Sequence, residues 1–174
     1  MGSEMCIRDR LKPAEQTPAS ILLFAELIQD IVPEGVLNIV NGLGTEAGVA
    51  LTASDRIDKI AFTGSTEVGK IINKAVAEKL IPVTLELGGK SPSVFFSDIM
   101  DQNDKFREKC VEGLAMFALN QGEICTCPSR ALVQEDIAED FLALAIERVK
   151  SINVGNPLDT YAMIGAPPSQ EQID

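Results

Sequence analysis

Histidine is absent from this sequence of 174 residues, and its absence removes several kinds of catalytic site. Ser-His-Asp and Cys-His catalysis both use an imidazole as the general base, and most catalytic zinc sites use imidazole ligands. Any reactive cysteine in the chain must therefore rely on a base of another type. The sequence also predicts no metal site.

Long apolar runs and positive charge are scarce as well. No apolar run approaches the roughly 20 residues that a membrane-spanning helix needs, and the first residues lack the basic and apolar regions of a signal peptide. The 15 Lys and Arg residues are outnumbered by 26 Asp and Glu, so the formal net charge is -11. An acidic chain offers no electrostatic surface to a phosphate backbone. We therefore expect a cytoplasmic protein with neither a membrane nor a nucleic-acid partner.

Cysteine is also infrequent, and its placement is irregular. Four cysteines in a chain of this length are too few for a disulfide framework, so we expect reduced thiols. These residues are Cys6, Cys110, Cys125 and Cys127.

Helical and extended patterns alternate along most of the chain. Apolar residues at helical spacing predict helices at residues 19–28, 46–53, 66–79, 106–119 and 136–152. Short β-branched runs predict strands at residues 36–40, 59–62, 82–87, 93–96 and 130–133, with loops at 97–104 and 155–174. This alternation predicts an α/β fold with a parallel sheet flanked by helices. Such sheets bind ligands at the carboxyl ends of their strands.

The first ten residues show no periodicity that connects them to this pattern. Residues 4–9 read EMCIRD, which resembles the translation of a sequencing-library transposon end. We therefore expect residues 1–10 to be a foreign leader.

Cys125 is the first candidate for chemistry, because it follows a glycine-containing turn at the end of a predicted helix. A thiol at such a turn can be presented to a substrate, and nearby amides or a base can favour the reactive thiolate. The alternative is a structural thiol, since free cysteine is often buried. Cys125 and Cys127 alone do not supply enough ligands for a metal.

Glu86 is the second candidate. This carboxylate interrupts an apolar strand end immediately before Gly88 and Gly89. Partial desolvation there would raise its pKa toward the range in which it accepts a proton at neutral pH. The alternative is a solvated residue at a strand edge.

The third candidate is the turn at Gly64 and Ser65, where a predicted strand enters a predicted helix. Helix N-terminal amides and a close backbone approach at glycine suit a pyrophosphate. A plain helix N-cap by Ser65 or Thr66 is the competing explanation. The Gly-x-Gly-x-x-Gly dinucleotide fingerprint is absent from the sequence.

Five segments, in this order, resemble signature segments of the NAD-dependent aldehyde dehydrogenase superfamily. They read KPAEQTP at residues 12–18, PEGVLNIVNG at 33–42, FTGSTEVG at 62–69, LELGGKSP at 85–92 and NQGEIC at 120–125. The resemblance covers residues 11–174. The run CTCPSR at 125–130 and the ending MIGA at 163–166 are most similar to the bacterial acetaldehyde dehydrogenase branch.

The resemblance implies a fold and a set of roles. It implies a Rossmann-like parallel sheet that forms the C-terminal part of an NAD-binding domain at residues 11–89. Residues 90–174 would begin an incomplete α/β catalytic domain. Cys125 would be the nucleophile and Glu86 the general base. The expected NAD contacts are Lys12, Glu15, Gly44, Gly48, Gly64, Ser65, Leu87 and Gly88.

The implied reaction oxidises a short aliphatic aldehyde such as acetaldehyde to a carboxylic acid, through a thiohemiacetal and a thioester on Cys125. A carboxylate at Glu15 suits a free ribose hydroxyl, which favours NAD over NADP. Family members carry further residues outside the matched region, among them an oxyanion-hole asparagine, a nicotinamide-ribose glutamate and an oligomerisation hairpin. We therefore expect a parent enzyme that is a homodimer or homotetramer, and little turnover from this chain alone.

Three alternatives stay open at this point. One is a catalytically silent NAD-binding or structural fragment. Another is a CoA-acylating aldehyde dehydrogenase, which Glu86 disfavours because a general base there promotes hydrolysis. The third is a cofactor-free thiol hydrolase, which would leave the cofactor-side segments without a purpose.

Overall fold

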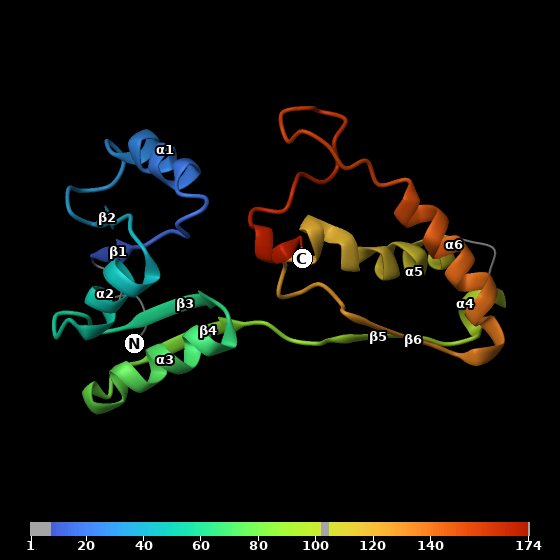
Figure 1. The fold of residues 1–174 in the computed structure, drawn as a ribbon, viewed down its shortest axis with the longest axis horizontal. Coiled ribbons are helices and arrows are strands. Elements are labelled where there is room, and N and C mark those ends of the chain that lie inside the picture. The colour runs from blue at the N-terminus through green and yellow to red at the C-terminus, as the bar shows by residue number, and fades with distance from the viewer. Residues whose placement is uncertain (1–7, 102–104, 174) are drawn as a thin grey trace. The chain divides into compact units, whose positions relative to one another are not determined.

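A computed structural model describes residues 8–101 and 105–173 of the chain. The chain divides into two compact units, Met1–Leu87 and Gly88–Asp174. Each unit contains parallel strands and helices (Figure 1), so the predicted α/β class is confirmed. Within the described residues, no helix has the length and apolar character needed to cross a membrane.

The first unit begins with a pair of short parallel strands. β1 (Asp9–Leu11) pairs with β2 (Leu37–Ile39), and helix α1 (Ala19–Ile28) connects them. The Asn38 side-chain amide donates to the carbonyls of Asp9 and Gly35 at 3.1 and 2.9 Å, which fixes the end of the connection. Two residues of the predicted leader therefore lie in a strand, while residues 1–7 of that leader lie outside the described residues.

A second parallel pair forms the other half of this unit. β3 (Ile60–Gly64) pairs with β4 (Val83–Leu87), and helix α3 (Thr66–Val76) crosses between them. A Cβ atom on Gly69 would lie 2.8 Å from a Leu87 methyl carbon, so α3 approaches β4 too closely for a larger side chain without a shift. This contact is the close helix-to-strand approach for which glycine is suited.

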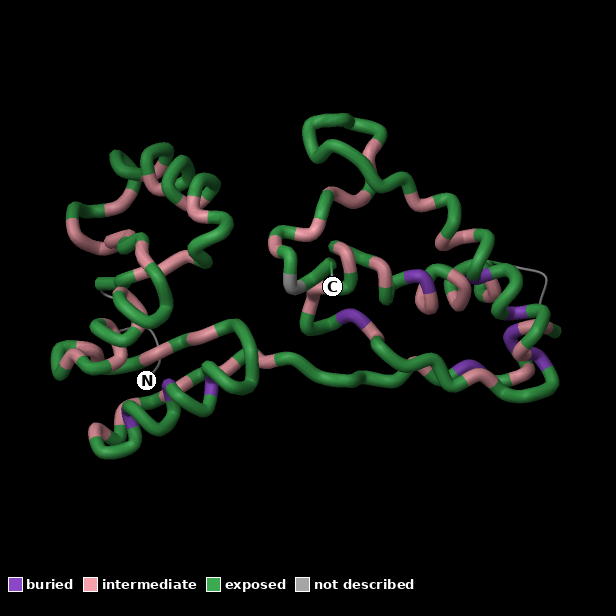
Figure 2. Tube along the Cα trace, in the orientation of Figure 1, coloured by how far each residue is buried: buried purple, intermediate pink, exposed green. Residues whose placement is uncertain are grey.

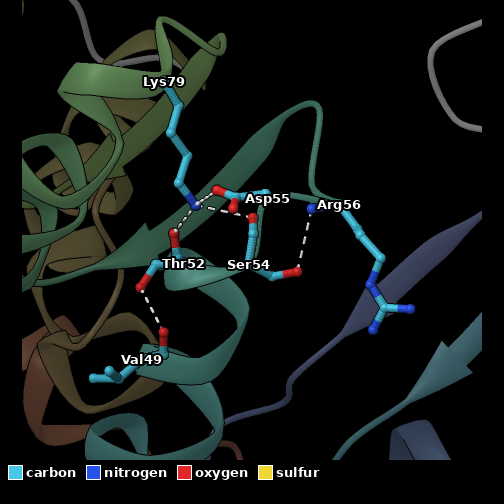
Figure 3. Close-up of polar contacts among 6 residues, drawn as sticks. All are labelled: Val49, Thr52, Ser54, Asp55, Arg56 and Lys79. Carbon is cyan, nitrogen blue, oxygen red and sulfur yellow. Dashed lines mark hydrogen bonds and ion pairs between the residues drawn. The ribbon is translucent and has the colours of Figure 1, made fainter.

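A short helical segment lies between the two strand pairs and is anchored by a lysine. A π-helical turn (Gly44–Gly48) runs into α2 (Val49–Ala53). The Lys79 ammonium donates to the carbonyls of Thr52 and Ser54 at 3.0 and 2.9 Å, and lies 3.7 Å from an Asp55 carboxylate oxygen (Figure 3). A cation at helix-terminal carbonyls satisfies acceptors that have no partner within the helix.

The second unit combines one strand pair with helices. Its strands are β5 (Pro92–Phe95) and β6 (Arg130–Val133), and its α-helices are α4 (Asp98–Asp101), α5 (Lys105–Ala115) and α6 (Ala138–Lys150). Its 3₁₀ segments are Met116–Gly122, Glu135–Ile137 and Gln170–Gln172. β5 and β6 are parallel. The core consists of Phe95, Ile99, Ile137 and Phe141, and the Phe95 and Phe141 ring centroids lie 4.7 Å apart. Figure 2 shows buried residues on α4 and α6 and, in the first unit, on α3.

Two sequence predictions differ from the structure. Residues 97–104 were expected to form a loop, but α4 (Asp98–Asp101) occupies part of that segment because Ile99 is buried in the core. The predicted helix at 106–119 leaves the α conformation after Ala115. The parallel strands form three separate pairs among the described residues, because alternation predicts parallel pairing but not how many strands join.

Candidate functional site

Four of the predicted cofactor residues lie together in the first unit. The Lys12 ammonium donates to a Glu15 carboxylate oxygen at 3.1 Å and to the Pro13 carbonyl at 2.9 Å. The backbone of Gly44, where the π-helical turn begins, also lowers the pKa of the Glu15 carboxyl. A Cβ on Gly48 would lie 3.9 Å from the Lys12 side chain. The structure thus joins the loop that follows β1 and the segment 44–48 in one cluster.

This cluster keeps the Glu15 carboxylate ionised. A backbone hydrogen bond within Glu15 itself, the hydrogen bond and charge of Lys12, and the Gly44 backbone hold its pKa below the ordinary value. The Glu15 side chain is 39% accessible, whereas that of Lys12 is 14% accessible. An ionised, accessible carboxylate held by a neighbouring cation is suited to accept hydrogen bonds from hydroxyl groups of a ligand.

Gly64 and Ser65 lie where β3 passes into α3. The Ser65 hydroxyl oxygen accepts from the Val68 N–H at 3.2 Å, so Ser65 is the N-cap of this helix. A Cβ atom on Gly64 would overlap the Phe62 ring, so a larger residue there would require that ring to move. The N-cap explanation therefore holds for Ser65, and it is compatible with an anion at the same helix terminus.

Glu86 and Leu87 end the strand that neighbours β3. In the register of the pair, Glu86 lies opposite Thr63 and Leu87 lies opposite Gly64. Leu87 packs on α3 at Gly69, whereas Glu86 points to the opposite face and is exposed. The expectation that Glu86 is partly desolvated is wrong for this structure, because strand alternation places it on the uncovered face. Gly88, the next residue, is exposed and begins the second unit.

An unusual backbone precedes Cys125 in the second unit. Asn120, Gln121 and Gly122 have φ angles of 48°, 61° and 81°, and two of these three residues are not glycine. Each non-glycine residue in this region costs about 1–3 kcal/mol unless its surroundings hold it. The Gln121 side-chain amide donates to the Ala166 carbonyl at 3.0 Å, which ties the segment to the C-terminal loop. Strain of this kind is concentrated at functional sites.

The two cysteines that follow have different environments. The Cys127 N–H donates to the Ile124 carbonyl at 3.0 Å, so residues 124–127 form a turn. Cys125 is exposed on this turn, whereas Cys127 is only 8% accessible and its thiol lies 3.5 Å from the Leu119 carbonyl. Exposure of Cys125 agrees with its predicted presentation to a substrate, and the structural-thiol alternative describes Cys127 instead.

A cavity of about 400 Å³ lies beside this turn, and the sequence patterns gave no sign of it. Two residues of its lining are joined by a hydrogen bond, in which the Arg130 guanidinium donates to the Lys90 carbonyl at 3.0 Å. The residues that line it are Gly89, Lys90, Ser93, Leu114, Phe117, Gly122, Ile124, Cys127, Pro128, Ser129, Arg130 and Ala131. Two further features were missed for the same reason, the Gln121–Ala166 tether and the Gly69–Leu87 contact, because each joins segments that only folding brings together.

The predicted general base and nucleophile belong to different units. Glu86 ends the first unit and Cys125 lies in the second. The described residues contain no group of three or more His, Cys, Asp or Glu side chains that could hold a metal ion.

Comparison with known proteins identifies the family. The profile of the Aldehyde dehydrogenase family matches residues 10–174. A long-chain-aldehyde dehydrogenase of Acinetobacter sp is 66% identical over 93% of this chain and 32% of its own length. Acetaldehyde dehydrogenase 2 of Cupriavidus necator is 58% identical over 94% of this chain and 32% of its own length. The chain therefore spans about a third of these curated relatives.

Solved structures agree with this assignment. A mutant of the indole-3-acetaldehyde dehydrogenase of P. syringae, in complex with NAD+ and IAA, superposes with a TM-score of 0.86 at 35% identity, covering 95% of this chain and 33% of that one. An E. coli NADP dependent enzyme superposes with a TM-score of 0.84 at 36% identity, covering 94% of this chain and 33% of that one. Because the family profile matches nearly every residue and the solved structures share the fold, this chain belongs to the aldehyde dehydrogenase family.

Proposed function

We propose that the full-length protein carrying this segment oxidises an aldehyde to a carboxylic acid, with Cys125 as the nucleophile. The observation that carries the proposal is the exposed Cys125 on a turn that follows a strained, tethered backbone, next to a cysteine that is buried. The Cys125 thiolate attacks the aldehyde carbon and forms a thiohemiacetal, which becomes a thioester when a hydride leaves that carbon. The Cys125 backbone N–H is one donor to the developing oxyanion.

We assign the release of the acyl group to Glu86 and water. An exposed carboxylate at the end of β4 is reachable by solvent and can take a proton from an attacking water molecule. Hydrolysis of the thioester then yields the carboxylic acid and regenerates the Cys125 thiol. This role distinguishes the proposal from the CoA-acylating alternative, in which a second thiol releases the acyl group.

NAD is the cofactor that the first unit fits. Bound NAD would accept the hydride that leaves the thiohemiacetal. Lys12, Glu15 and Gly44 form a preformed polar cluster, and an ionised Glu15 accepts from ribose hydroxyls. A phosphate on the ribose would be repelled by the same carboxylate. Gly64 and Ser65 supply the helix terminus for the pyrophosphate, and Leu87 and Gly88 border the nicotinamide side.

For the substrate we propose a short aliphatic aldehyde such as acetaldehyde. A second candidate is a long-chain aldehyde, favoured by the 66% identity to a long-chain-aldehyde dehydrogenase against 58% to an acetaldehyde dehydrogenase. Comparing kcat/KM for acetaldehyde and decanal in the full-length protein decides between the two chain lengths. We also propose that the full-length protein is a homodimer or homotetramer, which light scattering after gel filtration would establish.

The decisive experiment measures NADH formation by absorbance in the full-length protein and three variants. Cys125→Ala is expected to abolish turnover, whereas Cys127→Ser is expected to retain it because a hydroxyl can also donate to the Leu119 carbonyl. Glu86→Gln is expected to release one NADH per active site in a burst and then stall at the thioester. Full activity in Cys125→Ala would overturn the proposed nucleophile, and undiminished steady-state turnover in Glu86→Gln would overturn the proposed base.

The same assay on the 174-residue chain separates the active protein from the silent-fragment alternative. We expect little turnover from this chain alone. Saturable binding of NAD by isothermal titration, weakened by Glu15→Gln, is expected if the first unit retains its cofactor cluster. Normal turnover by the 174-residue chain would contradict this expectation, and unchanged binding in Glu15→Gln would contradict the assignment of Glu15.

A further inference from the structure

The turn at residues 124–127 places two thiols close together. The Cα atoms of residues two apart are joined by two steps of about 3.8 Å, so they cannot be more than about 7.6 Å apart. The hydrogen bond from the Cys127 N–H to the Ile124 carbonyl bends the chain between Cys125 and Cys127 and shortens this separation. A disulfide requires Cα atoms about 4.4–6.8 Å apart. The turn therefore brings the two backbones within reach of a disulfide.

The two sulfur atoms differ in their access to solvent. Cys125 is exposed, and an oxidant in solution reaches it directly. Cys127 is 8% accessible and is held at the Leu119 carbonyl. Oxidation of a thiol to sulfenic acid follows its exposure, so Cys125 is oxidised first. Cys127 stays reduced during this step and is available for a second one.

Space beside Cys127 allows its side chain to move. Cys127 lines the cavity of about 400 Å³ together with Leu114 and Phe117. Pro128 restricts the backbone of the residue before it, which limits movement of the Cys127 backbone. Rotation about the Cys127 Cα–Cβ bond is therefore the movement that carries its sulfur away from Leu119. The single weak hydrogen bond to the Leu119 carbonyl is the only polar contact described for this thiol.

We propose that Cys127 is a resolving thiol that converts oxidised Cys125 into a reversible Cys125–Cys127 disulfide. The oxidant is hydrogen peroxide. The Cys125 thiolate attacks one of its oxygen atoms, so that an S–O bond forms, the O–O bond breaks, and hydroxide leaves. Cys125 becomes a sulfenic acid. The Cys127 sulfur then attacks the Cys125 sulfur; the S–S bond forms, the S–O bond breaks, and the departing hydroxide takes the Cys127 proton as water. Two thiols and one peroxide give one disulfide and two waters.

The proposed disulfide would protect Cys125 rather than destroy it. Sulfinic and sulfonic acids cannot be returned to the thiol by ordinary reductants, whereas a disulfide can. A disulfide that closes so small a ring is strained, and strained or exposed disulfides are the labile ones that thiol reductants reopen. The consequence for turnover rests on the proposed function of Cys125, but the thiol chemistry itself does not.

A peptide experiment tests the inference without any measurement of turnover. The 174-residue chain is prepared with Cys6→Ser and Cys110→Ser, treated with hydrogen peroxide, and alkylated. Cleavage by trypsin and a glutamate-specific protease after Glu123 and Arg130 releases the heptapeptide ICTCPSR, which contains both thiols. The expected product is this peptide, unalkylated and lighter by the mass of two hydrogen atoms, and restored to two alkylatable thiols by dithiothreitol.

Two controls make the result specific. Cys127→Ser in the same background is expected to lose the disulfide and to shift Cys125 to the sulfinic and sulfonic products. The parent background in concentrated urea is expected to form the disulfide more slowly, because the turn and the cavity are lost. Sulfinic or sulfonic Cys125 beside an alkylated Cys127 in the folded parent background would overturn the inference. An equal rate in urea would overturn it too. Because neither readout uses turnover, failure here is distinguishable from failure of the proposed function.

Discussion

Truncation of Phe141 to alanine probes the core of the second unit. Phe141 lies on α6, has no accessible surface, and packs against Phe95, Ile99 and Ile137. Its ring centroid lies 4.7 Å from that of Phe95 at an interplanar angle of 42°. No other side chain in the described core is so completely buried, so its removal leaves a cavity that β5, α4 and α6 all border.

The expected loss of stability follows from this burial. Removing a fully buried Phe side chain costs about 3–5 kcal/mol, from lost transfer energy and the cavity left behind. The total free energy of unfolding of a protein of this kind is about 5–15 kcal/mol. Ile146→Ala is the matched control, because Ile146 lies on the same helix with 52% of its surface exposed. Because half of this side chain is exposed, its truncation loses only about half of the transfer free energy, roughly 1 kcal/mol, and the higher helix propensity of alanine offsets part of that loss.

Hydrogen exchange followed by mass spectrometry of peptides is the suitable assay, because it resolves the two units separately. Phe141→Ala is expected to lower protection throughout β5, α5 and α6 while leaving β3 and β4 protected, since the core cluster of Phe141 contains residues of the second unit alone. Ile146→Ala is expected to change protection little. Equal losses in the two variants, or loss of protection in β3 and β4, would refute the reasoning that this core holds its own unit together.

Two further predictions concern the first unit. Lys79→Met is expected to lower the free energy of unfolding by about 1–3 kcal/mol, because it leaves the Thr52 and Ser54 carbonyls without their donor. Urea unfolding followed by circular dichroism measures this loss. The control is Lys74→Met, at an exposed residue of α3, and an equal effect of that substitution would contradict the prediction. The pKa of Glu15 is held low by its own backbone hydrogen bond and by Lys12, so its contribution to stability is present above its unfolded pKa and is lost as the pH falls through the folded pKa. The unmodified chain is therefore expected to melt at a higher temperature than Glu15→Gln at neutral pH, and this difference is expected to shrink as the pH falls through the folded pKa. A difference that grows toward low pH would refute the sign.

Local patterns predicted most regular elements of this protein. Periods of two and of about 3.6 residues reflect which face of a strand or helix is buried, so α1, α3, α6 and all strands after β1 could be recognised from the residues themselves. β1 escaped recognition because two of its three residues belong to the polar segment 1–10, which shows no period and was expected to be a leader. α4 escaped because its acidic residues resemble a loop, and only the burial of Ile99 shows that the segment packs.

Some features of the candidate site could also be recognised from the sequence, whereas others were visible only in the structure. The family resemblance selected Cys125 rather than Cys127 as the nucleophile, and the structure exposes the first thiol and buries the second. The resemblance named Lys12 and Glu15 as NAD contacts, but it did not predict the ion pair between them. The contact of Glu15 with Gly44 could not, and the exposure of Glu86 contradicted an expectation drawn from its apolar neighbours.

The sequence by itself determined the local conformations, the acidic charge, the absence of histidine and the family-specific segments, since these depend on residue types and on neighbours a few positions apart. Tertiary structure alone decided which strands pair, how Gly44 meets Glu15, how Gln121 reaches Ala166, and where a cavity opens beside Cys127. The physical reason is that such contacts depend on the packing of segments far apart in the chain. Local periodicity reports that a face is buried, but it does not report what covers that face.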